Sequence, residues 1–233
     1  MKIKSLYISA GEKNVGALFV SMGMMEVLKR NLHRVAFFRP IILCKNIRDK
    51  DIDFILQKYE LDMEYEDAYG FDVDYIENMI ASKRSDELIN ELIKKFKKLE
   101  ESYDFILCEG IRKAFLTPTI EYDLNMLLAQ NFGSSIINII NAKDKSVQDI
   151  YENILIEKEN LLSHECSHFA TFINRVDERE YLKLKEKLKD SGENIYILKE
   201  VKELDIPTIE DVVEVLDAKI AHCFNACNTR AVR

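Results

Sequence analysis

The sequence predicts a three-layer α/β/α domain built on a mostly parallel β-sheet. Short, continuously apolar segments alternate with longer amphipathic segments along most of the 233 residues. Continuously apolar segments are typical of strands buried on both faces. Strands and helices in strict alternation imply right-handed crossovers within one parallel sheet. The length allows one large domain with a substantial core.

The elements follow from these segments in chain order. Strands are predicted at residues 6–8, 35–38, 105–108, 136–140, 169–176 and 195–198. The three-to-four spacing of apolar residues predicts helices at 16–32, 85–101, 122–131, 146–162, 178–190 and 208–216. Ser85, followed by Asp86 and Glu87, is a favourable helix start. The segment Asn131-Phe132-Gly133 is typical of a helix end.

Residues 42–84 fit the alternation less well, because they hold an acidic, Tyr-rich stretch at 59–75. We interpret them as helices and loops inserted between the second and third predicted strands. The α/β domain is expected to span residues 1–216. Residues 217–233 form a tail, either the start of a further domain or a loose terminus.

Composition and charge exclude several function classes. The formal net charge of −8 disfavours general nucleic-acid binding, and the basic run at 94–98 shares its predicted helix with acidic residues, as a solvated face would. No apolar segment has signal-peptide or membrane-spanning character, so we expect no membrane partner and a cytoplasmic location. Cys44 and Cys108, in apolar segments, fit reduced thiols in that compartment.

The loop AGEKNVGAL at residues 10–18 has the position and glycine spacing of a phosphate-binding loop. Its candidate anion- or nucleotide-binding residues are Gly11, Lys13, Asn14, Val15 and Gly16. Ala17 replaces the lysine that reaches the terminal phosphates, and Leu18 replaces the hydroxyl residue that holds magnesium. Lys13 could contact a phosphate by another route. The alternative is a tight strand-to-helix turn that binds nothing.

Two further candidates follow predicted strands. Glu109 comes directly after the strand at 105–108, where a carboxylate could hold Mg²⁺ with a nucleotide, and it is the one metal candidate we retain. No other cofactor is expected. Asn174 and Asp177, at the end of the strand at 169–176, could recognise a purine base. Alternatively, they form a polar turn in which Asp177 caps the next helix.

Two groups of metal-ligating residue types are weaker candidates. His164, Cys166 and His168 could share one face of a strand, but a polar loop before the strand is the simpler interpretation. His222, Cys223 and Cys227 lie in the tail without a usual zinc spacing.

Four segments, at residues 6–28, 37–41, 104–110 and 174–177, together resemble the dethiobiotin-synthetase-like branch of P-loop proteins. Further details are NVG (14–16) with SMGM (21–24), FRPI (38–41), Pro118 with EYDLN (121–125), and IPTIEDV (206–212). These details resemble, more narrowly, the N-terminal domain of long-form phosphate acetyltransferases. Residues 42–84 resemble that domain least.

The resemblance implies a non-catalytic regulatory or assembly domain, because in that family a separate C-terminal domain transfers acetyl between coenzyme A and phosphate. It implies an effector crevice at Arg39, Glu109, Asn174 and Asp177. The expected partners are a small anionic effector, other copies of the chain, or other domains of the same enzyme. Arg39 stands where working synthetases have a lysine, which disfavours ATP-driven ligation.

Two alternatives stay open. One is an ATP-dependent ligase of the dethiobiotin or cobyrinic type, in which Lys13 replaces the missing lysine and Glu109 holds magnesium. The other is an interaction domain that binds no ligand.

Overall fold

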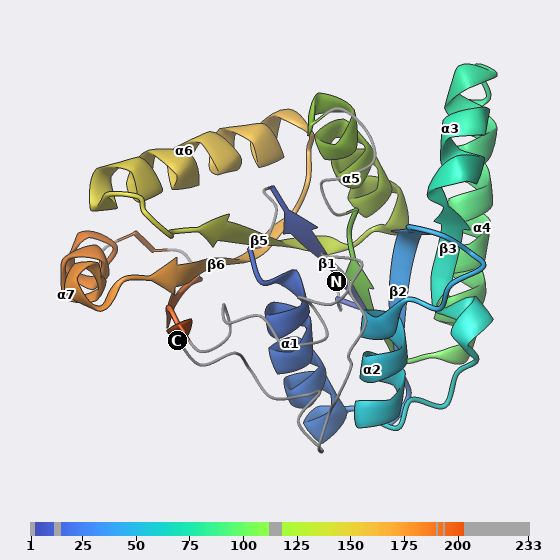
Figure 1. The fold of residues 1–233 in the computed structure, drawn as a ribbon, viewed down its shortest axis with the longest axis horizontal. Helices are drawn as coiled ribbons and strands as arrows, with labels where there is room; N and C mark the ends of the chain where they lie inside the picture. Colours follow the sequence, from blue (N-terminus) through green and yellow to red (C-terminus); the bar gives the residue numbers. More distant parts are fainter. Residues whose placement is uncertain (1–2, 12–14, 112–117, 190, 193, 203–233) are drawn as a thin grey trace, which may run out of the picture.

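The computed structural model describes residues 3–11, 15–111, 118–189, 191–192 and 194–202. Within these residues, a seven-stranded sheet runs through the molecule with helices on both faces (Figure 1). Every strand pair in it is parallel. The predicted three-layer α/β/α class is therefore confirmed.

The strand order is β3-β2-β4-β1-β5-β6-β7, which places β1 at the centre between β4 and β5. The strands are β1 (Ser5–Ala10), β2 (Val35–Ile42), β3 (Tyr69–Asp72), β4 (Phe105–Glu109), β5 (Ser135–Asn141), β6 (His168–Val176) and β7 (Ile195–Lys199). β1, β2 and β4 are buried along their whole length. Since no face of these three strands meets water, their sequences are apolar without alternation.

The helices are divided between the two faces of the sheet. They are α1 (Ala17–Asn31), α2 (Lys50–Lys58), α3 (Val73–Ala81), α4 (Ser85–Ser102), α5 (Pro118–Phe132), α6 (Val147–Ser163) and α7 (Glu178–Lys187). One core contains residues of α1 and α2, together with Phe37 of β2. A second core contains residues of α3, α4 and α5, together with Phe38. A third lies under α6 and α7. In Figure 1, α5 and α6 lie above the sheet and α1 below it.

Residues 42–84 contain one element that the sequence interpretation omitted. Besides α2, the short 3₁₀ helix Tyr65–Asp67 and α3, they include the edge strand β3, which pairs with β2. β3 has four residues, one of them a glycine, so it produces almost no periodic signal. The insertion thus extends the sheet by one strand as well as covering it with helices.

Helix boundaries differ from the predicted ones by a few residues. α5 begins at Pro118, four residues before the predicted start, and proline suits the first turn of a helix. α7 ends at Lys187 rather than at 190. The helix predicted at 208–216 and the tail at 217–233 lie outside the described residues.

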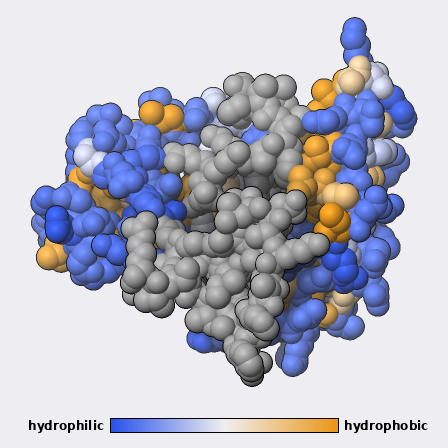
Figure 2. Space-filling model, in the orientation of Figure 1, coloured by the Kyte–Doolittle hydropathy of each residue, from blue (hydrophilic) through white to orange (hydrophobic). Residues whose placement is uncertain are grey.

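The surface agrees with the acidic, charged composition. Figure 2 shows mostly hydrophilic side chains over α6 and α7, at the left of the view. No helix within the described ranges is long and apolar enough to cross a membrane.

Candidate functional site

The phosphate-loop residues that the structure describes lie between the end of β1 and the start of α1. Gly11 follows β1, and Gly16 is the N-cap of α1 with a left-handed φ of 84°. Gly16 needs to be glycine for a second reason, since a Cβ there would lie 2.3 Å from Asn174 Nδ2. Lys13 and Asn14 lie outside the described residues.

Asn174 is the residue that fixes the end of this loop. It is buried near the end of β6, and its Nδ2 donates to the Val15 carbonyl oxygen at 2.7 Å. Its Oδ1 accepts from the backbone N–H of Arg175 at 2.9 Å. The side chain is therefore engaged with the protein backbone at both ends.

Whereas Asn174 bonds to the phosphate loop, Asp177 caps a helix. It is the exposed N-cap of α7, and its carboxylate accepts from the backbone N–H of Arg179 at 2.8 Å. This is the helix cap that our second interpretation of the segment expected. Base recognition by the two side chains together stays a prediction.

Glu109 lies at the end of β4, next to β1 and the phosphate loop. Both of its carboxylate oxygens are occupied: Oε1 accepts from Arg39 Nη2 at 2.7 Å, and Oε2 accepts from the Ser21 hydroxyl at 2.7 Å. All three side chains are almost completely buried. Because β2 pairs with β4, Arg39 and Glu109 are brought together from distant parts of the sequence.

Two aspartates add further negative charge around Arg39. Its Nη1 donates to Asp49, and Nη2 lies 3.6 Å from Asp51 Oδ2. Burial by itself lowers the pKa of Arg39, but Glu109, Asp49 and Asp51 outweigh it and hold that pKa above its usual value. For Asp49, burial raises the pKa, and Arg39 outweighs it so that the pKa is lowered.

Asp49 also begins α2. Its Oδ1 accepts from the backbone N–H groups of Asp51 and Ile52, which makes it the N-cap of this helix. The insertion at 42–84 thus supplies one wall of the Arg39 cluster, which we define as Arg39, Glu109, Ser21, Asp49 and Asp51.

A Mg²⁺ ion at Glu109 would compete with Arg39 and Ser21 for the carboxylate, because each of these two side chains already donates to one of its oxygens. Ala17 and Leu18 offer no ligand, and Leu18 packs against the core beneath α1. Among the described residues, no three His, Cys, Asp or Glu side chains lie together in a group that could hold a metal. His164 and His168 contact the Asn160 carbonyl and the Thr171 hydroxyl instead.

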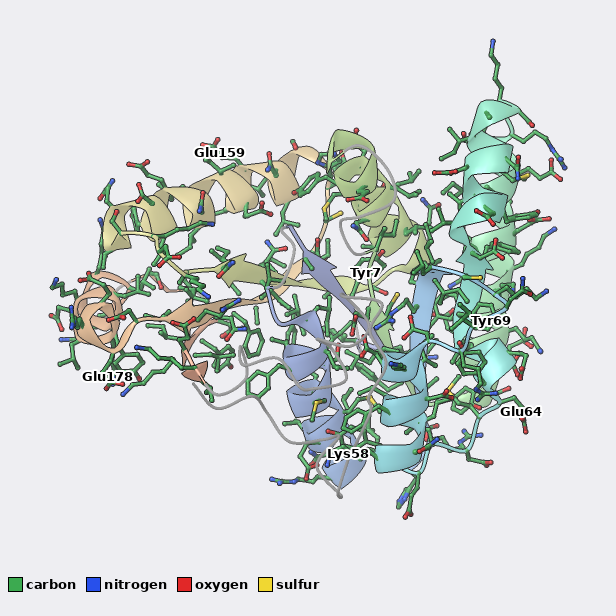
Figure 3. All side chains as sticks on the ribbon, in the orientation of Figure 1. Tyr7, Lys58, Glu64, Tyr69, Glu159 and Glu178 are labelled. Atoms are coloured by element: carbon green, nitrogen blue, oxygen red, sulfur yellow. The ribbon has the colours of Figure 1, made fainter. Side chains whose placement is uncertain are left out.

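A second polar cluster lies on the other side of β1. The Asn125 Oδ1 of α5 accepts from the Tyr7 hydroxyl at 2.7 Å and from the backbone N–H of Ile111 at 2.8 Å. Burial, with Cys108 adding to it, raises the pKa of Tyr7 far above its usual value, so the hydroxyl stays protonated and donates. Figure 3 shows Tyr7 on β1 in the middle of the molecule.

Gly110 allows these groups to approach each other. A Cβ at this position would lie 2.5 Å from Asn125 Oδ1 and 2.8 Å from the Ile8 carbonyl oxygen. Beside the cluster, a pocket of about 160 Å³ reaches from Ser9 and Gly11 to α5 and α6. The sequence interpretation quoted Asn125 within the EYDLN segment but assigned it no role, and it named neither Ser21 nor Asp49 as site residues.

A buried parallel sheet whose central strand leads through a glycine loop into α1 defines a P-loop-type α/β protein. The family model described as an AAA domain matches residues 4–215, and the chain belongs to that family. The FtsY signal recognition particle receptor from Elizabethkingia anophelis has a similar fold, with a TM-score of 0.52 and 7% identity over 84% of this chain and 58% of that one.

The curated relatives that match the sequence include a phosphate acetyltransferase and a dethiobiotin synthetase. Phosphate acetyltransferase from Nitratidesulfovibrio vulgaris is 33% identical over 97% of this chain. The ATP-dependent dethiobiotin synthetase from Clostridium perfringens is 26% identical over 58% of this chain and 68% of its own length. The resemblance noted from the motifs is confirmed. The chain spans 33% of the length of the acetyltransferase that it matches.

Proposed function

We propose that this chain is a non-catalytic regulatory or assembly domain of a phosphate acetyltransferase, acting in the cytoplasm. In this proposal the interconversion of acetyl-CoA plus phosphate with acetyl phosphate plus coenzyme A takes place in a separate domain. The chain contributes a binding crevice for a small anionic effector, a surface for other subunits, or both. The 33% identity to a phosphate acetyltransferase over nearly the whole chain supports the proposal that the parent enzyme is a phosphate acetyltransferase.

The single observation that carries the non-catalytic role is the closed Arg39 cluster. Nucleotide chemistry in this fold needs a lysine at the terminal phosphates and a carboxylate available to Mg²⁺ and its waters. Here position 17 is a buried alanine, and both Glu109 oxygens accept from Arg39 and Ser21. The site holds its charges in ion pairs with one another.

Two features support an anionic effector. The first turn of α1, which follows the loop, contains no acidic residue, and a helix N-terminus attracts negative charge. Arg39 also keeps a buried Nε–H without an acceptor in the described part of the chain.

A calorimetric titration with ATP and Mg²⁺, for the wild type and for Glu109→Gln, tests the non-catalytic role. We expect no Mg²⁺-dependent binding at millimolar ATP and no hydrolysis in either protein. Acetyl transfer by this chain alone, or Mg²⁺-dependent ATP hydrolysis that disappears in Glu109→Gln, would contradict the proposal.

Effector binding needs its own variant. Gly16→Glu is unsuitable, because any Cβ at Gly16 collides with Asn174. A Cβ at Gly11 meets only Glu157 Oε1, at an ordinary 3.8 Å. We expect Gly11→Asp, which adds a negative charge to the loop, to abolish binding of inorganic phosphate, and Gly11→Ala to retain it. Equal phosphate binding by both variants would show that phosphate does not bind at the loop, and no binding by the wild type would favour a ligand-free interaction domain.

The dethiobiotin-type ligase remains a second candidate because one curated relative is an ATP-dependent dethiobiotin synthetase. It would require Lys13 to reach the phosphates and Glu109 to exchange Arg39 for Mg²⁺. The same titration decides between the two, since only the ligase predicts hydrolysis that depends on Glu109.

A further inference from the structure

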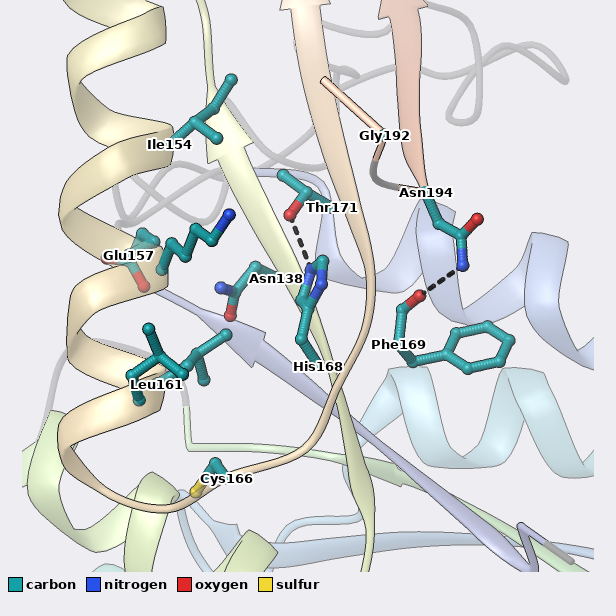
Figure 4. Close-up of a pocket in the computed structure, with 12 residues that line it drawn as sticks. Asn138, Ile154, Glu157, Leu161, Cys166, His168, Phe169, Thr171, Gly192 and Asn194 are labelled. Carbon is teal, nitrogen blue, oxygen red and sulfur yellow. Dashed lines mark hydrogen bonds between the residues drawn. The ribbon is translucent and has the colours of Figure 1, made fainter. Parts of the chain in front are cut away.

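A pocket of about 330 Å³ lies beneath α6, away from the Arg39 cluster (Figure 4). Its walls come from α6, from β5 and β6, and from the segment before β7. In volume it stands at the small end of pockets that bind organic ligands. Among the described residues, Glu157 alone is shared with the smaller pocket beside Gly11.

Asn138 forms the floor of this pocket. It lies in the middle of β5, in register with Ser9 of β1 and Thr171 of β6, and is only 3% exposed. Figure 4 shows its amide between α6 and the His168 ring. The Asn138 amide lines the pocket, and no hydrogen bond to it is seen among the described residues. It is not one of the polar atoms sealed in the core without a partner, so its donor and acceptor can bond to a molecule in the pocket.

The neighbouring polar groups are held in place around that amide. His168 Nε2 lies 2.9 Å from the Thr171 hydroxyl, which fixes the imidazole at one side of the pocket. Ile154 and Leu161 of α6 supply an apolar wall on another side. The charged residues Glu157 and Lys158 also belong to the lining.

We propose that this pocket binds a flat heteroaromatic ring that presents an adjacent donor and acceptor, as the edge of adenine does, and that Asn138 recognises that edge. A carboxamide offers one donor and one acceptor side by side, which match the N6 amino group and N7 of adenine. The ring faces pack between the apolar wall of α6 and the fixed imidazole. The assignment does not depend on the regulatory function proposed above.

The test titrates the full chain with adenosine by calorimetry or ligand-observed NMR. Asn138→Leu keeps the side-chain size and removes both hydrogen-bonding groups, so we expect adenosine affinity to fall about tenfold or more. Asn138→Asp keeps an acceptor but no donor and should weaken binding as well. Asn78→Leu is the matched control, because Asn78 is exposed on α3 and bonds only within its own helix.

The ligand offers an independent version of the same test. N6,N6-dimethyladenosine has lost the donor of the edge, so it should bind the wild type weakly and be insensitive to Asn138→Leu. This comparison needs no assumption about how well a variant folds, since the wild type alone must discriminate between the two compounds.

The outcomes separate the proposal from its rivals. Adenosine affinity that falls in Asn138→Leu and not in Asn78→Leu supports it. In that case a comparison of adenosine with AMP tells whether a nucleoside or a nucleotide is the source of the ring. Adenosine binding that survives Asn138→Leu, equal affinity for the dimethyl compound, or no binding at millimolar adenosine overturns it.

Discussion

Arg39 Nη2 lies 2.7 Å from Glu109 Oε1, and both side chains are shielded from solvent. Glu109 ends β4, and the sequence predicts it as the candidate ligand for Mg²⁺. Desolvating two charges is costly, and the cost is offset only when their partners are in place. Here the partners are Ser21 and the two aspartates of the insertion.

Removing one member of this buried pair should lower the free energy of unfolding far more than breaking an exposed ion pair. We expect Glu109→Ala to lower the free energy of unfolding by about 3–5 kcal/mol, because it leaves a buried guanidinium without its main partner. The control is Asp104→Ala, which breaks the exposed pair with Arg34 and should have only a small effect. Urea denaturation measures both, and similar losses would contradict the buried-pair account.

Asp49 should make stability depend on pH in acid. Its folded pKa is lowered, so its contribution is present above the unfolded value of about 3.9 and is lost as the pH falls through the folded value. Asp49→Asn keeps an N-cap for α2 and removes the charge. The gap in stability between wild type and variant should narrow from pH 7 to pH 3. A gap that stays constant would show that the charge is not responsible.

Replacing two different glycines by alanine should change the free energy of unfolding in opposite directions. Gly110→Ala places a Cβ 2.5 Å from Asn125 Oδ1, and we expect it to lower the free energy of unfolding by about 1–3 kcal/mol or more. Gly23 lies inside α1 with open space around its Cα, so Gly23→Ala should raise that free energy by about 0.5–1 kcal/mol. Thermal unfolding of the two variants checks the prediction, which fails if both move the same way.

Replacing Asn174 or Asp177 by alanine should change amide hydrogen exchange in different helices. Asn174→Ala removes the bond to the Val15 carbonyl, so amide hydrogen exchange in the first turn of α1 should accelerate. Asp177→Ala removes the cap of α7, costs about 1 kcal/mol, and should accelerate exchange only there. If Asn174→Ala left α1 unchanged, the fixing role that we assign to it would be wrong.

The parts of the fold that depend on local residue type could be predicted from the sequence. Every predicted strand is present. For β1, β2 and β4 the reason is that a strand buried on both faces is mostly apolar, and that signal survives in a single sequence. β3 was missed because its pairing with β2 depends on tertiary contact rather than on its own composition. The sheet order was equally inaccessible, since nothing in residues 105–109 says which strands will flank them.

The candidate site was predictable as a set of positions but not as a set of contacts. Glu109 and Arg39 were both named, yet their pairing follows from the neighbouring places of β2 and β4 in the sheet. Asp49 was overlooked although an aspartate before a helix is an ordinary N-cap signal. Asn138 gave no signal at all, because an asparagine inside an apolar strand reveals its lack of a partner only when the strands around it are known.

The central position of β1 has a consequence for how the chain reaches its native state. Tyr7 is paired with Cys108 on one side and Ile136 on the other. The first strand therefore has no neighbour in the sheet until β4 (Phe105–Glu109) has been made, and its second neighbour, β5, follows only at Ser135–Asn141. Contacts this distant along the chain slow folding and leave apolar segments open to aggregation in the meantime.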